Sequence, residues 1–285
     1  MKVIRKADEL KEACSAARAQ GLSVGFVPTM GALHDGHLSL VSRARRENDV
    51  VAVSVFVNPT QFNNPDDLRT YPRTEEADLA KLEAAGVDFA FVPTVEEMYP
   101  EPDTRQFDLG PVAEVMEGAM RPGHFNGVAQ VVSRLFTMTT PTRAYFGEKD
   151  FQQIGVIRRM VELEGGFGGL EIVPVPIKRE ADGLAMSSRN VRLTPENRAA
   201  APNIHKALVH GVELAKTMTP AEVTEAVIKE IDATPGLRTE YFQIVDGPTC
   251  QPITKWSQSE EPVGCVTVHA GDVRLIDNIK FTTAC

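Results

Sequence analysis

The fold is decided by residues 23–57, SVGFVPTMGALHDGHLSLVSRARRENDVVAVSVFV. Residues 23–27 are a short apolar run, and residues 50–57 are continuous, apolar and rich in β-branched side chains, which is typical of buried strands. Residues 38–48 between them follow a helical pattern. A strand, a helix and a second strand at this spacing predict a βαβ unit with parallel strands.

The same alternation continues to about residue 177. Further strands are expected at 89–92, 143–146 and 171–175, and further helices at 74–85, 127–138 and 151–164. From residue 178 the pattern changes to two helices, 194–217 and 220–232, and three clustered strands, 240–245, 262–269 and 273–276. The sequence therefore predicts an α/β chain, with a parallel-sheet domain over 1–177 and a smaller α+β domain over 178–285.

The composition is that of an ordinary globular protein. Of the 285 residues, 42% are hydrophobic and 24% are charged, which argues against disorder and allows a sizeable core. The net charge of -9 and the lack of a Lys/Arg cluster disfavour non-specific binding of nucleic acid. The four cysteines are scattered, the N-terminus lacks a signal-peptide pattern, and no long apolar run occurs. We expect a reduced, cytoplasmic, soluble protein without a membrane partner.

The first candidate site is the segment 28–40, PTMGALHDGHLSL, directly after the strand at 23–27. His34 and His37 are three residues apart where the helix begins, so they share one helix face. A helix N-terminus attracts phosphate, and imidazoles there can donate hydrogen bonds to phosphoryl oxygens. The alternatives are a metal-binding pair and two histidines that cap the loop, but no cysteine or third histidine has metal-ligand spacing. We interpret the segment as a phosphate site.

A second polar segment, 56–73, overlaps the end of the strand at 50–57. Ordinary turn chemistry explains Asn63 and Asn64, but it explains Gln61 poorly. A neutral amide such as that of Gln61 can hold the hydroxyl or carboxylate oxygens of a small substrate.

Two later segments also follow predicted strands. In AYFGEKDFQQ, residues 144–153, Lys149 can contact phosphate, although a charged helix start explains the same residues. In READGLAMSSRNVRL, residues 179–193, two serines and Arg189 can hold a triphosphate, with a serine-capped helix or a flexible interdomain linker as the alternative. RPGHFNGVAQ, residues 121–130, is grouped with AYFGEKDFQQ, and the residues alone do not indicate a role for it. Neither a P-loop nor a GxGxxG sequence occurs.

Together these segments resemble a known family. HDGH at 34–37 and MSSRN at 186–190 resemble the HxGH and KMSKS-type signatures of the nucleotidylyl-transferase superfamily. Seven strings occur in one order, from about residue 24 to residue 279: PTMGALHDGH, FVNPTQF, YPRT, RPGHF, AYFGEKDFQQ, DGLAMSSRN and RLIDN. This combination closely resembles the pantothenate synthetase (pantoate–β-alanine ligase) family.

The resemblance implies a Rossmann-like N-terminal domain that binds ATP and pantoate, a smaller C-terminal lid domain, and a cytoplasmic homodimer. The implied reaction is the ATP-dependent condensation of (R)-pantoate with β-alanine to pantothenate, AMP and pyrophosphate, through a pantoyl adenylate. ATP is then a substrate, and Mg²⁺ is expected as its counter-ion.

The resemblance also assigns residues. Three strings and one further lysine are implied to contact ATP: Met30, Gly31, Ala32, Leu33, His34, Asp35, Gly36, His37, Gly147, Glu148, Lys149, Asp150, Lys178, Met186, Ser187, Ser188 and Arg189. Catalytic roles are implied for His37 as proton donor, for His34 and for Lys149. Gln61 and Gln153 are implied to bind pantoate, with Gln61 near the place where β-alanine arrives. Lys178 is expected to act through its backbone.

Two other functions remain open from the residues. An adenylyltransferase that joins ATP to a mononucleotide would need a pocket for a second phosphate, whereas Gln61 and Gln153 are neutral. An ATP-sensing module without catalysis would not require both the HxGH and the MSSRN signatures. The last residues, 281–285, lie beyond the resemblance.

Overall fold

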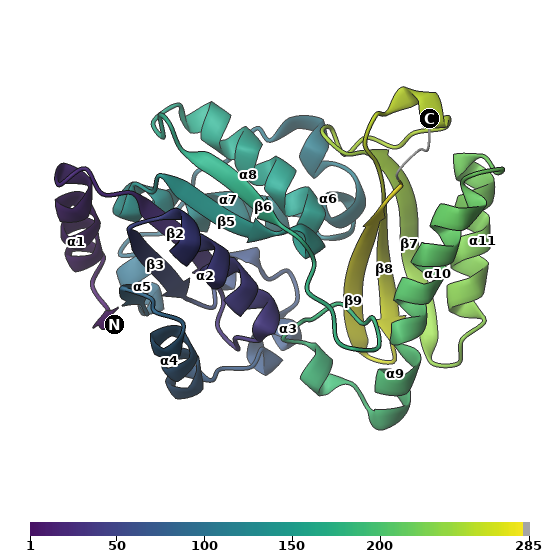
Figure 1. The fold of residues 1–285 in the computed structure, drawn as a ribbon, viewed down its shortest axis with the longest axis horizontal. Helices are drawn as coiled ribbons and strands as arrows, with labels where there is room; N and C mark the ends of the chain where they lie inside the picture. Colours follow the sequence, from purple (N-terminus) through teal and green to yellow (C-terminus); the bar gives the residue numbers. More distant parts are fainter. Residues whose placement is uncertain (282–285) are drawn as a thin grey trace. The chain divides into compact units, whose positions relative to one another are not determined.

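The computed structural model describes residues 1–281 (Figure 1). Within this range the strands form a six-stranded sheet in the order β1-β4-β3-β2-β5-β6 and a three-stranded sheet in the order β7-β8-β9. The strands are β1 Lys2–Ile4, β2 Val24–Thr29, β3 Val50–Val55, β4 Phe89–Phe91, β5 Arg143–Gly147, β6 Glu171–Val175, β7 Leu237–Asp246, β8 Pro262–Ala270 and β9 Val273–Lys280. Every pairing in the first sheet is parallel and every pairing in the second is antiparallel, which confirms the predicted fold class.

Helices connect these strands. The α-helices are α1 Ala7–Ala19, α2 Asp35–Glu47, α3 Pro65–Thr70, α4 Glu75–Ala84, α5 Val95–Met98, α6 Met116–Met120, α7 His124–Thr139, α8 Phe151–Glu164, α9 Pro195–Ala200, α10 Pro202–Leu214 and α11 Pro220–Asp232. Short 3₁₀ helices are η1 Pro59–Gln61, η2 Gly110–Ala113, η3 Glu148–Asp150, η4 Asn190–Arg192 and η5 Trp256–Gln258. Each of the longer helices overlaps an expected helix, apart from α1, where no helix was expected.

The chain divides into two compact units. The first comprises Met1–Leu109, Arg121–Glu148 and Val156–Pro176, and the second comprises Gly110–Met120, Lys149–Gly155 and the chain from Ile177 onward. The second unit thus includes two short segments that precede residue 178.

The first unit is built around the parallel sheet. β2 and β3 are buried along nearly their whole length, as their continuous apolar sequence predicts. α2 packs on β2, β3 and β5 with α4 beside it, and Figure 1 shows α2 in front of the sheet and α7 behind it. The core on the α2 side includes Val27, Leu40, Val41, Ala44, Val51, Val53, Leu82 and Tyr145.

The second unit is an α+β layer. α10 and α11 pack against each other, α11 contacts β7, and α10 contacts β9 (Figure 1). Apolar residues recur on the inner faces of these helices and strands and form one core, which includes Ile204, Leu208, Val223, Val227, Phe242, Val266, Val268 and Leu275. The sheet is therefore covered by helices on one face, as the succession of helices and strands predicts.

Glu117 attaches the segment Gly110–Met120 to the three-stranded sheet of this unit through hydrogen bonds. Its buried carboxylate accepts hydrogen bonds from Arg274 Nη1 and Nη2 at 2.7 and 2.8 Å. It also accepts from the Tyr241 hydroxyl at 2.8 Å and from Thr267 Oγ1 at 3.0 Å. These donors belong to β9, β7 and β8, so one carboxylate is bonded to all three strands. A bidentate arginine pair of this kind is both stronger and more directional than a neutral hydrogen bond.

Two expectations about the second unit need correction. The single helix expected at 194–217 is two helices, α9 and α10, because Pro202 opens α10 and cannot donate the backbone hydrogen bond that would continue α9. The strands β7 and β9 are also longer than expected, since their backbones continue to pair with β8 beyond the ranges that the apolar pattern indicated.

Three cysteines lie within the described chain, and all are buried with free thiols: Cys14, Cys250 and Cys265. Burial raises the pKa of the Cys14 and Cys250 thiols to about 12, which keeps them protonated. Cys285 and the rest of 282–285 lie outside the described residues. Within 1–281, no helix combines the length and the apolar character that a membrane crossing requires.

Candidate active site

The parallel sheet brings three predicted site segments to one edge. β2 lies between β3 and β5, and all three strands run in the same direction. The chain moves from β2 to β3 and β4 on one side, and then returns to place β5 and β6 on the other. The strand order therefore reverses between β2 and β5, and ligands of such sheets bind at the carboxyl ends of the strands at that point. The segments after Thr29, Val55 and Gly147 all start there.

His34 and His37 form a reciprocal cap at the start of α2. Gly36 N–H donates to His34 Nδ1 at 3.1 Å, and His34 N–H donates to His37 Nδ1 at 3.3 Å. The ring centroids of the two imidazoles are 4.1 Å apart. Because a nitrogen that accepts a hydrogen bond carries no proton, each neutral ring has its proton on Nε2.

The capping role and the proposed phosphate role are therefore compatible. Capping uses Nδ1 of each ring and the backbone of the loop, and it leaves Nε2–H as the donor of the neutral ring. Two imidazoles held in this tautomer can donate to an anion without first being protonated. His34 is the N-cap itself, so both rings lie at the positive end of the α2 dipole.

Gln61 is buried at the end of η1, next to the loop that contains Met30. Its Nε2 donates to Met30 Sδ at 3.1 Å, and its Oε1 accepts from Asn58 Nδ2 at 3.1 Å. An amide can donate two hydrogen bonds and accept two, so both ends of Gln61 keep capacity for a ligand. The structure thus brings Met30 and Gln61 into contact, as expected from the adjacent strands β2 and β3.

Asn58 organises the start of this turn. Its Oδ1 accepts from Thr60 N–H at 3.4 Å and from the Tyr99 hydroxyl at 2.8 Å. Burial raises the pKa of Tyr99, so the phenol stays protonated and remains a donor to Asn58. Further along, Asn64 caps α3 by accepting from Asp66 N–H at 2.9 Å, in agreement with the turn chemistry expected for that residue.

His124 and Gly127 of α7 support the backbone around Gln61. His124 Nδ1 donates to the carbonyl oxygen of Gln61 at 2.8 Å. The carbonyl of Gly127 accepts from Asn58 Nδ2 at 3.2 Å, and a Cβ at position 127 would lie 2.5 Å from Thr60 O. The sequence pointed to this RPGHFNG stretch without a role for it, and the structure identifies it as the support of Gln61.

The strand β5 ends at Gly147, and η3 follows with Glu148, Lys149 and Asp150. Within the second unit, Lys149 Nζ lies 3.3 Å from Asp150 Oδ1 and Oδ2. The ammonium is thus close to a carboxylate while remaining partly accessible, with 18% of its side chain exposed. The charged start expected for α8 is present, and it does not exclude a phosphate role for Lys149.

Gln152 and Gln153 both lie in the first turn of α8, and they differ in burial. Gln152 is buried, donates to the carbonyls of Val112 and Val115 at 2.8 Å, and accepts from Glu117 N–H at 3.0 Å. Its amide is therefore used within the protein. Gln153 is half-buried and is the member of the pair that can serve a ligand.

The segment that leads into MSSRN is a hairpin whose two sides are joined by backbone hydrogen bonds. Met186 N–H donates to the carbonyl of Lys178 at 3.0 Å, and Arg179 pairs with Ala185 in an antiparallel bridge. Arg189 N–H donates to Ser187 Oγ at 3.2 Å. The two sides of the hairpin are hydrogen-bonded to each other within the second unit, which disfavours the flexible-linker interpretation.

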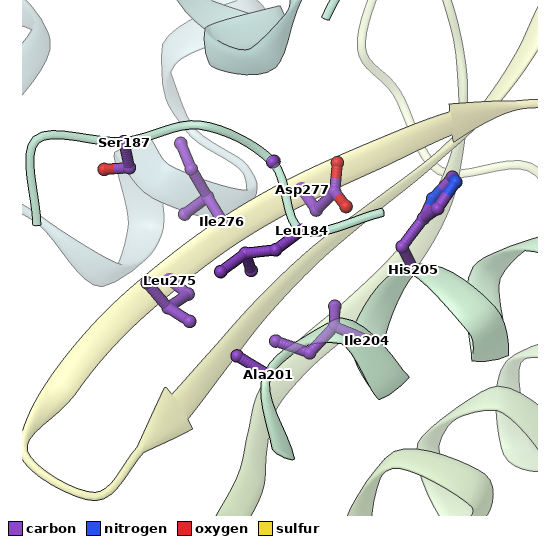
Figure 2. A pocket seen from close by; sticks show the side chains of 9 residues that line it. Leu184, Ser187, Ala201, Ile204, His205, Leu275, Ile276 and Asp277 are labelled. Carbon is purple, nitrogen blue, oxygen red and sulfur yellow. The ribbon is translucent and has the colours of Figure 1, made fainter. Parts of the chain in front are cut away.

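Two neighbouring residues of β9 hold this hairpin and the Lys149 segment within the second unit. Arg179 donates to Asp277 Oδ2 at 2.6 Å and to Asp277 Oδ1 at 2.9 Å. Asn278 Nδ2 donates to the carbonyl of Lys149 at 3.1 Å. Figure 2 shows Ser187 and His205 on opposite sides of a pocket of about 10 Å³, with Asp277 between them. The RLIDN string thus connects two predicted ATP segments.

The side chains of the described residues do not build a metal site by themselves. Among residues 1–281, no group of three or more His, Cys, Asp or Glu side chains is arranged to hold a metal ion.

Sequence relatives agree on one family. The family model for pantoate-beta-alanine ligase matches residues 2–280. The pantothenate synthetase of Phocaeicola vulgatus is 58% identical over 281 residues, which cover 99% of this chain and 99% of the relative. The pantothenate synthetase of Porphyromonas gingivalis W83 is 57% identical with the same coverage.

Solved structures agree as well. The pantothenate synthetase from Thermus thermophilus is 48% identical with a TM-score of 0.91, covering 99% of this chain and 100% of that one. The pantoate-beta-alanine ligase from Francisella tularensis, in complex with beta-gamma ATP and beta-alanine, is 34% identical with a TM-score of 0.81. That comparison covers 99% of this chain and 98% of the other. Because the match extends over essentially the whole chain, this protein belongs to the pantoate-beta-alanine ligase family.

Proposed function

We propose that this chain joins (R)-pantoate to β-alanine at the expense of ATP and forms pantothenate, AMP and pyrophosphate. The observation that carries the proposal is the full-length family match of a chain that retains both phosphate signatures, HDGH and MSSRN. The Francisella relative was solved with an ATP compound and β-alanine, which fits the same pair of substrates here.

In the first step, a carboxylate oxygen of pantoate attacks the α-phosphorus of ATP, and the bond from that phosphorus to the pyrophosphate oxygen breaks. The transition state gathers negative charge on the phosphoryl oxygens. The Nε2–H groups of His34 and His37 would donate to those oxygens, and the ammonium of Lys149 would offset the charge of the triphosphate. His37 serves as the proton donor. Donors of this kind are typically worth ~10²–10³ in rate each.

In the second step, the unprotonated amine of β-alanine attacks the carbonyl carbon of the pantoyl adenylate. The C–O bond to the phosphate breaks, AMP leaves with the former carboxylate oxygen, and the amine loses one proton. Gln61 and Gln153 would hold pantoate through both steps, since their neutral amides can pair with its hydroxyl and carboxylate groups. Orientation supplies most of the acceleration, because the amine is already a good nucleophile.

The remaining ATP contacts are assigned to the strings around these residues: Met30 to His37, Gly147 to Asp150, the backbone of Lys178, and Met186 to Arg189. Mg²⁺ would enter with ATP as its counter-ion and would supply further neutralisation of the phosphates. Residues 1–177 would form the domain that binds ATP and pantoate, and residues 178–285 would act as a lid that protects the mixed anhydride from water. We further propose a homodimer in the cytoplasm.

Omission of each substrate in turn tests the function. Purified protein is supplied with ATP, Mg²⁺, pantoate and β-alanine, and AMP, pyrophosphate and pantothenate are separated and quantified. Multiple turnovers should need all three substrates, and omission of β-alanine should limit pyrophosphate to about one equivalent per site. A dinucleotide product would favour the adenylyltransferase alternative, and the absence of any AMP would favour an ATP-sensing module.

A further inference from the structure

Asp78 of α4 contacts the loop between β2 and α2, although no motif in the sequence assigns it a role. Its side chain is fully buried. Ala32 N–H donates to Asp78 Oδ2 at 2.8 Å, and Leu33 N–H donates to Asp78 Oδ1 at 2.7 Å. Both oxygens are therefore acceptors, as expected for an ionised carboxylate, and such charge-assisted bonds are shorter and stronger than neutral ones.

Lys81 completes the contact from the next turn of the same helix. Its Nζ donates to the carbonyl of Leu33 at 2.5 Å. Asp78 and Lys81 are three residues apart, so they lie on one face of α4. Together they bind both backbone polar groups of Leu33, and we call this pair the α4 clamp.

The loop that the α4 clamp holds has an unfavourable backbone conformation at two residues. Gly31 has φ +79° and Ala32 has φ +49°, and the left-handed region is strained for alanine. A Cβ at Gly31 would lie only 3.1 Å from Asp78 Oδ2. A strained shape persists only where surrounding contacts over-determine it, and such strain gathers at functional sites. The next residue after Leu33 is His34, the N-cap of α2.

We propose that Asp78 and Lys81 are positioning residues for the adenylation step. By fixing residues 32 and 33, they set where His34 begins α2 and so hold both imidazoles in the arrangement that presents Nε2–H to phosphate. The inference rests on the proposed function. Asp78 acts through the loop and not on the substrate or Mg²⁺, because both of its oxygens are already bonded to amides and the side chain is buried.

The substitution Asp78→Asn tests the role at little change in volume. An asparagine has one acceptor oxygen, so its NH₂ group must face one of the two amide donors. Asp88→Asn is the matched control, because Asp88 Oδ2 accepts from Val51 N–H at 2.7 Å at the opposite end of the sheet from the loop. Both half-reactions are measured: pyrophosphate release without β-alanine, and pantothenate formation from supplied pantoyl adenylate.

We expect Asp78→Asn to lower the rate constant of pyrophosphate release at saturating ATP and pantoate ~10–100-fold, since small misplacements of catalytic groups have effects of this size. The second half-reaction should change less than about threefold, and Asp88→Asn should leave the rates of both half-reactions unchanged. An unchanged first step, or equal losses in both steps, would overturn the proposal. If Asp78→Asn does not fold, Lys81→Met is the test. It should slow pyrophosphate release ~3–10-fold without slowing the second half-reaction, and Lys81→Arg should restore the rate of pyrophosphate release.

The ¹⁵N chemical shifts of the imidazoles separate this proposal from the proposed function. Wild-type His34 and His37 should show the Nε2–H tautomer, and Asp78→Asn or Lys81→Met should shift both rings while Asp88→Asn does not. Wild-type protein that makes no pyrophosphate from ATP and pantoate would reject the proposed function and leave the imidazole measurement valid. Identical imidazole spectra in the wild type and both clamp variants would reject the α4 clamp.

Discussion

Gly127→Ala is a sensitive probe of how the protein holds Gln61. The glycine lies in the first turns of α7, where the helix touches η1. An added Cβ would lie 2.5 Å from Thr60 O and 2.8 Å from Gln61 N. An ordinary contact begins near 3.4 Å, so η1 and α7 would have to separate by about 0.9 Å. The turn that carries Gln61 would move by a similar amount.

Two effects on stability oppose each other. Alanine in place of glycine favours a helix by ~0.5–1 kcal/mol. Overpacking of a well-filled contact costs ~1–3 kcal/mol. The net destabilisation should therefore be at most about 2.5 kcal/mol, which a folded enzyme tolerates. The catalytic effect should be larger, because a displacement approaching 1 Å can lower the rate about 10²-fold. We expect kcat/KM for pantoate to fall ~10–100-fold while KM for ATP changes less than threefold.

The assay is steady-state pantothenate formation with pantoate and ATP varied separately, together with urea unfolding. Gly168→Ala is the matched control, since a Cβ at that position meets nothing within 4 Å. It should leave both kinetic parameters and the unfolding midpoint nearly unchanged. Wild-type pantoate kinetics in Gly127→Ala, or an equal loss for ATP, would refute the support of Gln61 by α7.

Four further predictions concern other parts of the protein. His37→Ala should slow pantoyl-adenylate formation ~10²–10³-fold with an unchanged circular dichroism spectrum, and a near-normal rate would remove His37 from the mechanism. Gln153→Leu should weaken pantoate binding and leave ATP binding intact, as measured by calorimetric titration of each ligand, and equal losses would count against a pantoate role. Asp277→Asn breaks the bidentate ion pair with Arg179, and only 6% of the Asp277 side chain and 19% of the Arg179 side chain are exposed. Urea unfolding should therefore show a loss of ~3–5 kcal/mol in the free energy of unfolding. Burial and the nearby Arg179 guanidinium lower the pKa of His205 below 6.5. The neutral imidazole therefore contributes its full stabilisation above pH 6.5, and the protein loses stability as the pH falls below that value. In urea unfolding at pH 7 and pH 5, His205→Gln should lose less stability between the two pH values than the wild type, and an equal loss would contradict this role of His205.

The central strands could be predicted because their sequence is unambiguous. β2 and β3 are continuous apolar runs, and a parallel strand that is covered on both faces needs that composition. β1 has only three residues, of which two are exposed, so its sequence shows no hydrophobic pattern that would predict a strand. It becomes a strand because its backbone pairs with β4.

The site was predictable where chemistry lies in local strings, and it was not where support comes from afar. His34, His37 and Gln61 follow strands and belong to recognisable motifs, so the sequence identified them. Asp78 and His124 act through backbone groups 45 and 63 residues away, and nothing in their local sequence records those contacts. The contacts of Glu117 with β7, β8 and β9 could not be predicted for the same reason, because its partners lie more than 120 residues away in the sequence.

The central claim is that pantoate is activated as an acyl adenylate, and oxygen transfer tests it most directly. Pantoate labelled with ¹⁸O in its carboxylate is incubated with the enzyme, ATP, Mg²⁺ and β-alanine, and the AMP is analysed by mass spectrometry. Attack of the carboxylate on the α-phosphorus, followed by cleavage of the C–O bond, predicts one ¹⁸O atom in every AMP formed. Unlabelled AMP accompanied by pantothenate would contradict the account.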